Sequence, residues 1–117
     1  MWYPLHHMYQ SHLFLLAPDK LTLFTDWGHT LMAEHRDEAM ETLREEHCLF
    51  EAMYLLATPP TFYILALSSY SDEKIATNMK RALNRKHKEI MDSSFSEVDA
   101  IPKLDGVSMK LLYMFQA

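Results

Sequence analysis

The hydrophobic positions of the chain follow two kinds of pattern. Short apolar runs rich in aliphatic and aromatic side chains cover residues 12–16, 48–56, 62–69 and 108–115, which is typical of β-strands. The segment 57–61, with its two prolines, separates the second and third runs and predicts a hairpin turn, because proline fixes the backbone and cannot continue strand pairing. Four strands are therefore expected.

Two longer stretches between these runs have helical spacing. Residues 20–46 contain no proline and one glycine, and their apolar side chains share one side of a helical wheel: Phe24, Trp27, Leu31, Met32, Ala39 and Leu43. A capping signal at 71–73 starts a second stretch that runs to about residue 91, with apolar residues at helical spacing: Ile75, Ala76, Met79, Leu83 and Ile90. Each stretch predicts one helix.

The resulting order, β-α-β-β-α-β, predicts an α+β fold of the ferredoxin-like type: a four-stranded antiparallel sheet with two helices on one face. The chain has 117 residues, of which 49% are hydrophobic and 23% charged, as expected of one globular domain. We therefore expect a single domain over 1–117. Residues 1–8 form an N-terminal extension, and residues 96–107 form an irregular connection to the last strand.

The strands are apolar on both faces. In the run 48–56, Phe50 and Tyr54 alternate with Met53 and Leu55. A sheet that helices cover on one face only should instead alternate apolar with polar residues. The uncovered face would expose a larger apolar patch than a soluble monomer tolerates. We therefore expect a homodimer that forms through the sheet face, since one surface then serves both copies.

Composition excludes several classes of protein. Cys48 is the only cysteine, so the chain has no internal disulfide and no cysteine-based metal cage, and a reducing compartment fits it. The chain has no basic leader and no apolar stretch of about 18 residues, so we expect a cytoplasmic protein without a membrane partner. Its net charge of -5 argues against nucleic acid as a partner.

Seven histidines suggest a metal site, but their spacing does not support one. No H-x-x-x-H pair occurs, and His29 and His35, six residues apart, point about 120° away from each other on a helix. The sequence therefore predicts no metal site, and no motif indicates a cofactor.

Histidines beside carboxylates are the strongest candidates for chemistry, because such a pair can exchange a proton near neutral pH. His35 and Glu38 lie on the inner side of the first predicted helix, and His87 lies at the edge of the apolar face of the second. We expect them to border a cleft between the sheet and the helices. The candidate catalytic residues are His35, His87 and Glu38, and the candidate ligand-binding residues are Trp27, Leu31 and Glu51. In the alternative interpretation the histidines are half-buried structural residues and Glu38 pairs with a basic residue.

Part of the chain resembles a family of small bacterial domains of unknown function. The resemblance spans about residues 16–95 and is carried by these segments: 27–36, Glu38-Ala39, Thr42-Leu43, Glu46, Glu51, Tyr54-Leu55-Leu56 and His87-Lys88-Glu89. It implies a ferredoxin-like, dimeric α/β-barrel fold and dimerisation. It assigns no activity.

Three functions stay open at this point. The first is a homodimer that binds a small organic ligand in the cleft between sheet and helices. The second is a cofactor-independent oxygenase or isomerase with His35 or His87 as the base, which rests on fold analogy alone. The third is a purely structural or interaction module.

Overall fold

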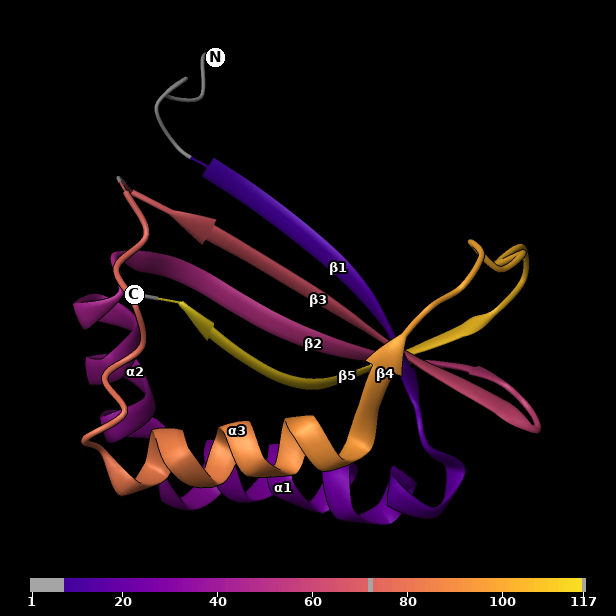
Figure 1. Cartoon of the computed structure of the whole chain (residues 1–117), viewed down its shortest axis with the longest axis horizontal. Helices are drawn as coiled ribbons and strands as arrows, with labels where there is room; N and C mark the ends of the chain where they lie inside the picture. Colours follow the sequence, from indigo (N-terminus) through magenta and orange to yellow (C-terminus); the bar gives the residue numbers. More distant parts are fainter. Residues whose placement is uncertain (1–7, 72, 117) are drawn as a thin grey trace.

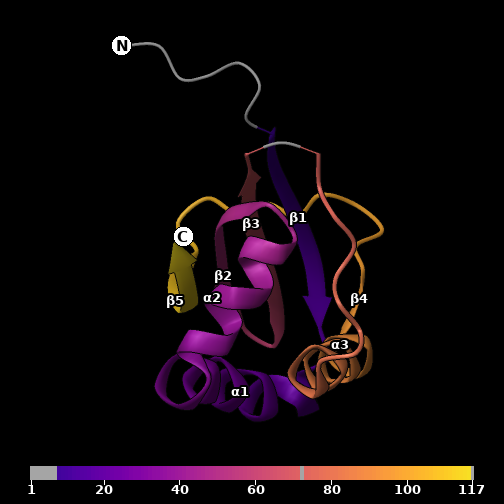
Figure 2. The same cartoon turned by 90° about the vertical axis from the view of Figure 1, so that its left-hand side faces the viewer.

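A mixed sheet-and-helix architecture is seen in the computed structural model, which describes residues 8–71 and 73–116 (Figure 1, Figure 2). Of the predicted N-terminal extension, residues 1–7 lie outside the described residues, whereas Met8 begins the first strand. The elements follow one another along the chain in this order: β1 (Met8–Leu16), η1 (Pro18–Lys20), α1 (Leu21–Glu34), α2 (Arg36–Glu45), β2 (Cys48–Thr58), β3 (Thr61–Tyr70), α3 (Ala82–Ser94), β4 (Phe95–Glu97) and β5 (Ser108–Gln116).

The sheet has five antiparallel strands in the order β4-β1-β3-β2-β5. The predicted four-stranded ferredoxin-like β-α-β-β-α-β arrangement of dimeric α/β-barrel type is therefore wrong, although the α+β class holds. The long last strand, β5, pairs with β2 at one edge, and β4 pairs with β1 at the other. Because β4 is three residues long and follows α3 directly, it is too short to show an alternating pattern in the sequence.

The predicted hairpin is confirmed. β2 and β3 pair from Thr58 and Thr61 at the turn to Cys48 and Tyr70 at the open end. A β-bulge lies between Cys48 and Phe50. Strict alternation would place Cys48 and Glu51 on opposite faces of the sheet, but the extra residue of the bulge turns both toward the helices.

The single helix expected over 20–46 is two helices. α1 ends at Glu34, and the chain changes direction at His35, so α2 stands across the end of the sheet (Figure 1). A straight helix of this length would measure about 40 Å, longer than the 37 Å longest dimension of the molecule. The bend lets Ala39 and Leu43 on α2 pack into the same core as Leu31 on α1.

The second of the two predicted helices corresponds to α3. It begins at Ala82, about ten residues later than the sequence predicts. Ser71 and residues 73–81, together called the loop 71–81, are irregular, and Ile75 and Met79 in this loop are exposed despite their helical spacing. Backbone hydrogen bonds tie this loop to the end of α2: Ser71 donates to His47, and Ile75 donates to Glu46. The N–H groups of Ser71 and Ile75 are thus bonded outside the loop and not within a helical turn.

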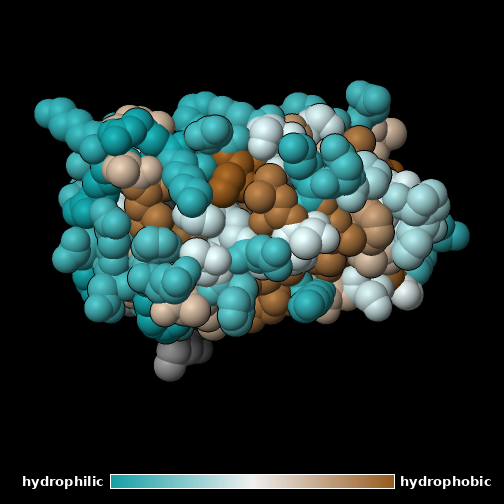
Figure 3. All heavy atoms as spheres, turned by 90° about the horizontal axis from the view of Figure 1, so that it is seen from below, coloured by the Kyte–Doolittle hydropathy of each residue, from teal (hydrophilic) through white to brown (hydrophobic). Residues whose placement is uncertain are grey.

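The hydrophobic core lies between the sheet and the helices. All three helices lie on one side of the sheet, with α1 and α3 side by side (Figure 1, Figure 2). The outer surface of α1 and α3 is polar at its margins and has apolar side chains along its middle (Figure 3). The largest fully buried side chains of the core are Tyr113, Phe24, Phe115, Leu16 and Ile64.

The opposite face of the sheet is also apolar. On β3, Phe62, Ile64 and Ala66 pack into the core, so the residues between them point away from the helices. The same alternation holds on β1 and β2. The apolar side chains on this outer face are partly exposed, apart from buried Ala52 and Leu56: Leu13, Leu15, Ala52, Tyr54, Leu56, Tyr63, Leu65 and Leu67.

Candidate functional site

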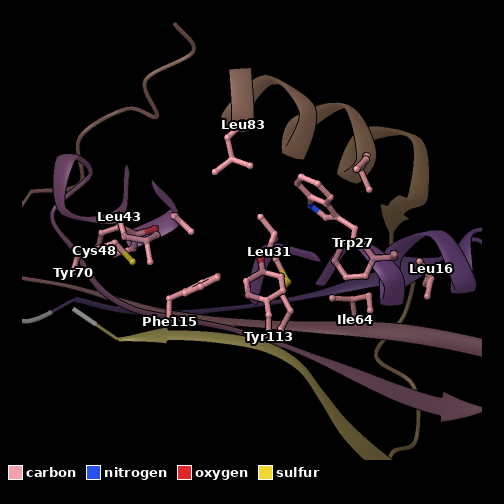
Figure 4. Packing of buried hydrophobic residues seen from close by; sticks show 14 residues of the cluster. Leu16, Trp27, Leu31, Leu43, Cys48, Ile64, Tyr70, Leu83, Tyr113 and Phe115 are labelled. Atoms are coloured by element: carbon pink, nitrogen blue, oxygen red, sulfur yellow. The ribbon is translucent and has the colours of Figure 1, made fainter. Parts of the chain in front are cut away.

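A cavity of about 480 Å³ opens between the helices, the loop 71–81 and the sheet. This volume falls within the range of small-molecule sites, roughly 300 to 1,000 Å³. Leu83 on α3 lies across from Tyr113 and Phe115 on β5, and Leu31 and Leu43 lie at either side (Figure 4). Most of the surface area of the wall is apolar, although more than half of the lining residues carry a polar or charged group. The polar and charged side chains on the wall are Thr42, Glu46, Glu51, Tyr70, Lys74, Thr77, Asn84, His87, Lys88, Asp92 and Tyr113.

A chain of hydrogen bonds runs from the core to the wall of the cavity. The indole N–H of Trp27 donates to Nδ1 of His87 at 2.8 Å. Since Nδ1 is then an acceptor, the neutral imidazole carries its proton on Nε2, which lies 3.5 Å from the hydroxyl of Tyr113. The Tyr113 hydroxyl in turn donates to the carboxylate of Glu51. This series of hydrogen bonds therefore ends at the carboxylate of Glu51, an acceptor on the cavity wall.

Burial sets the protonation states along this chain. It lowers the pKa of His87 to about 4, so the imidazole is neutral at pH 7. It also raises the pKa of Glu51 to about 7, with a further increase from the negative charge of Glu46, whereas Lys74 and the Tyr113 hydroxyl act in the opposite direction. The pKa of the Tyr113 hydroxyl lies well above its usual value, chiefly through burial. Glu51 therefore changes charge near neutral pH.

A second polar network holds Glu46, at the end of α2. The amide of Asn84 on α3 donates to the Thr42 hydroxyl at 2.6 Å and to the backbone carbonyl of Asn78 at 3.0 Å. The Thr42 hydroxyl donates to Glu46 at 3.4 Å. Desolvation is the largest influence on Glu46 and raises its pKa. The network fixes α2 against α3 and leaves a second carboxyl on the cavity wall.

The structure brings three of the six candidate residues together. Leu31, Glu51 and His87 line the cavity. Trp27 does not line it but donates a hydrogen bond to His87, which does. His35 does not line the cavity and lies between α1 and α2, with its ring 6.2 Å from that of Trp27.

Glu38 also lies outside the cavity wall and faces a basic residue instead. The guanidinium of Arg81 donates to Glu38 at 3.1 Å and to both oxygens of Glu45, and it approaches Glu41 at 3.4 Å. The helical wheel misplaced His35 and Glu38 because it assumed one straight helix through residue 35. Arg81 links the loop 71–81 to α2.

Sequence reasoning missed Tyr113, Glu46 and Asn84 as site residues. Tyr113 is one aromatic residue in an apolar strand, and Glu46 and Asn84 belong to charged or polar helix ends, so no local pattern distinguishes them. Glu51 did carry a signal, since it is the only charged residue in an otherwise apolar strand.

The described part of the chain offers neither a metal cluster nor a membrane-spanning helix. Within residues 8–71 and 73–116, no group of three or more His, Cys, Asp or Glu side chains could hold a metal ion. Nor does any helix of these residues have the length and apolar character needed to cross a membrane.

Comparison with known proteins identifies a family but no activity. No curated protein matches the chain, and no solved structure matches it. A family model does match, and it covers residues 9–115, nearly the whole chain. The resemblance to a domain family of unknown function is thereby confirmed. The chain belongs to DUF6176, a family of unknown function.

Proposed function

We propose that this protein binds a small organic ligand in the cavity between α2, α3 and β5. The observation that carries the proposal is a cavity of about 480 Å³ whose surface is mostly apolar and whose wall also carries polar and charged groups, the combination typical of ligand sites. An ionisable carboxyl such as Glu51 lowers folding stability when it is buried among apolar groups. A ligand that pairs with it would offset that loss.

The polar groups of the wall differ in what they offer a ligand. His87 is occupied, because Nδ1 accepts from Trp27 and Nε2 faces Tyr113. Glu51 accepts one hydrogen bond from Tyr113, and a carboxylate has further acceptor sites. We therefore place Glu51 at the centre of ligand recognition, with Tyr113 and His87 as residues that position it.

The same arrangement favours one alternative, acid-base catalysis with a carboxylate base. A base works best when its pKa lies near the working pH, and the pKa of Glu51 is about 7. His87, whose pKa is about 4, is poorly suited to be the base of an isomerase or oxygenase. Under this alternative Glu51 takes the proton.

A thermal-shift screen of small organic compounds tests ligand binding. Leu83→Trp fills the cavity from α3, and Leu23→Trp makes the same change at an exposed position on α1. We expect compounds that raise the melting temperature of the native protein to have the same effect on Leu23→Trp and to lose it on Leu83→Trp. Compounds that stabilise a folded Leu83→Trp variant as strongly as the native protein would refute the cavity as the site.

We also propose that the outer face of the sheet forms a symmetric homodimer. Its support is the set of partly exposed apolar side chains on β1, β2 and β3. They lie next to one another on one face and form a continuous apolar patch, which isolated exposed residues would not. The chain has a mass of 13.8 kDa, so light scattering at micromolar concentration should give about twice that mass. Leu65→Glu and Leu67→Lys should each yield monomers with native circular dichroism. A native protein that is monomeric under these conditions contradicts the dimer.

A further inference from the structure

We propose that the ligand of this cavity is a small organic cation, an amine with an apolar body, held where the carboxyls of Glu46 and Glu51 meet the aromatic side chains of Tyr70, Tyr113 and Phe115. This inference rests on the proposed function, since it names the ligand class of the same cavity. Carboxylate and aromatic groups together are the combination that recognises ammonium ions. All five side chains line the cavity.

The carboxyls determine the sign of the charge that the cavity accepts. Glu46 accepts from Thr42 and Glu51 accepts from Tyr113, so each is held in place by a neutral donor. The two carboxyls are close enough for each other's charge to matter, because the charge of Glu46 raises the pKa of Glu51. A bound anion would increase this repulsion, whereas an ammonium ion would relieve it and supply three hydrogen-bond donors.

The aromatic residues can contact both the apolar part of such a ligand and its positive charge. Tyr113 and Phe115 are adjacent on the wall of the cavity, with ring centroids 5.6 Å apart. Their ring faces attract cations, and their area replaces water around an apolar body. Leu31 and Leu83 continue this apolar wall away from the carboxyls.

The protein already places one ammonium ion of its own at this position. Nζ of Lys74 lies over the ring of Tyr70, 5.4 Å from its centroid. Its charge lowers the pKa of both Glu46 and Glu51. Lys74 is exposed and belongs to the irregular loop 71–81, so a ligand amine can take its place. The other lysine on the wall, Lys88, is paired with Asp92.

Ligand affinity should depend on pH. The titratable groups that act on Glu51 are Glu46, Lys74 and Tyr113, and Glu51 in turn raises the pKa values of Cys48 and Tyr70. His87 also lines the cavity and is neutral above its pKa of about 4. An ammonium ion binds the ionised carboxylate best, and Glu51 ionises near pH 7. We expect affinity to rise about tenfold between pH 6 and pH 8.

Isothermal titration calorimetry at pH 8 with three probes of similar shape tests the inference. The probes are 2-phenylethylamine, 2-phenylethanol and 3-phenylpropionate. We expect the amine to bind at least about tenfold more tightly than either of the others. If the alcohol or the carboxylate binds with an affinity equal to that of the amine, the assignment of a cationic ligand is wrong, but the proposal of a ligand-binding cavity is supported. If none of the three binds, both proposals are overturned for ligands of this size.

Two variants with matched controls separate the roles of the charges. Glu51→Gln should weaken amine binding about tenfold or more and abolish its pH dependence, whereas Glu89→Gln, an exposed change on α3, should leave both unchanged. Lys74→Met removes the competing ammonium and should tighten amine binding by about two- to fivefold, whereas exposed Lys103→Met should not. Unchanged affinity in Glu51→Gln, or weaker binding in Lys74→Met, would refute the amine site.

Discussion

Glu51→Gln should stabilise the protein at alkaline pH, and the size of the effect follows from the environment of the carboxyl. Burial raises the pKa of Glu51 from 4.5 to about 7. The unfolded chain therefore releases this proton above pH 4.5, and the native protein retains it until about pH 7. Stability is highest below pH 4.5 with respect to this group and falls as the pH rises to 7. The full loss is about 3 kcal/mol.

His87 contributes a slope of opposite sign. Burial lowers its pKa from 6.5 to about 4, so the unfolded chain takes up a proton below pH 6.5 that the native protein does not. Stability falls as the pH drops from 6.5 toward 4. Between pH 4.5 and 6.5 the slopes of Glu51 and His87 oppose each other, and the native protein should show little net change between pH 5 and pH 8.

Urea unfolding of the variants at pH 5 and pH 8 resolves the two slopes. Glu51→Gln keeps an acceptor for Tyr113 and should exceed the native protein in stability by about 3 kcal/mol at pH 8, with about 2 kcal/mol less advantage at pH 5. The free energy of unfolding of His87→Gln, relative to that of the native protein, should instead rise by about 2 kcal/mol on going from pH 8 to pH 5. Glu89→Gln is the control. An equal effect of Glu51→Gln at both pH values would show that the carboxyl is not desolvated and would refute the reasoning.

Three further changes probe the surroundings of the site. Trp27→Phe leaves Nδ1 of buried His87 without its donor and should lower the free energy of unfolding by about 2 kcal/mol in urea; an unchanged value would contradict the bond. Gly28→Val should cost about 2 kcal/mol by the same assay, because a Cβ on residue 28 would lie 3.1 Å from the carbonyl oxygen of Leu112. Arg81→Gln should lower the melting temperature more at low than at high salt, since Arg81 pairs with three glutamates of α2; a salt-independent change would point to lost packing.

The parts of the fold that the sequence predicted are those governed by local patterns. Apolar runs located β1, β2, β3 and β5, and the two prolines at 59 and 60 located the hairpin turn. Strand order could not follow from such patterns. Whether the last strand pairs with β1 or β2 depends on the connection 98–107, whose residues carry no pattern that favours either edge.

The candidate site was predictable only where one residue stood out from its element. Glu51 is charged within an apolar strand, and His87 is polar beside an apolar helix face, and both line the cavity. His35 and Glu38 were placed by a wheel that assumed a straight helix, and the bend at residue 35 moved them. Tyr113 comes from the far end of the chain, so its bond to His87 depends on the tertiary arrangement alone.

The central claim is that the cavity binds a small ligand, and the side-chain N–H of Trp27 reports on it directly. This N–H donates to His87 on the cavity wall, so a ligand that contacts His87, Tyr113 or Glu51 should shift its signal in ¹H–¹⁵N correlation spectra. During titration with a stabilising compound, we predict saturable shifts of the Trp27 indole and of the residues that line the cavity. Saturable shifts confined to residues away from the cavity would contradict the claim.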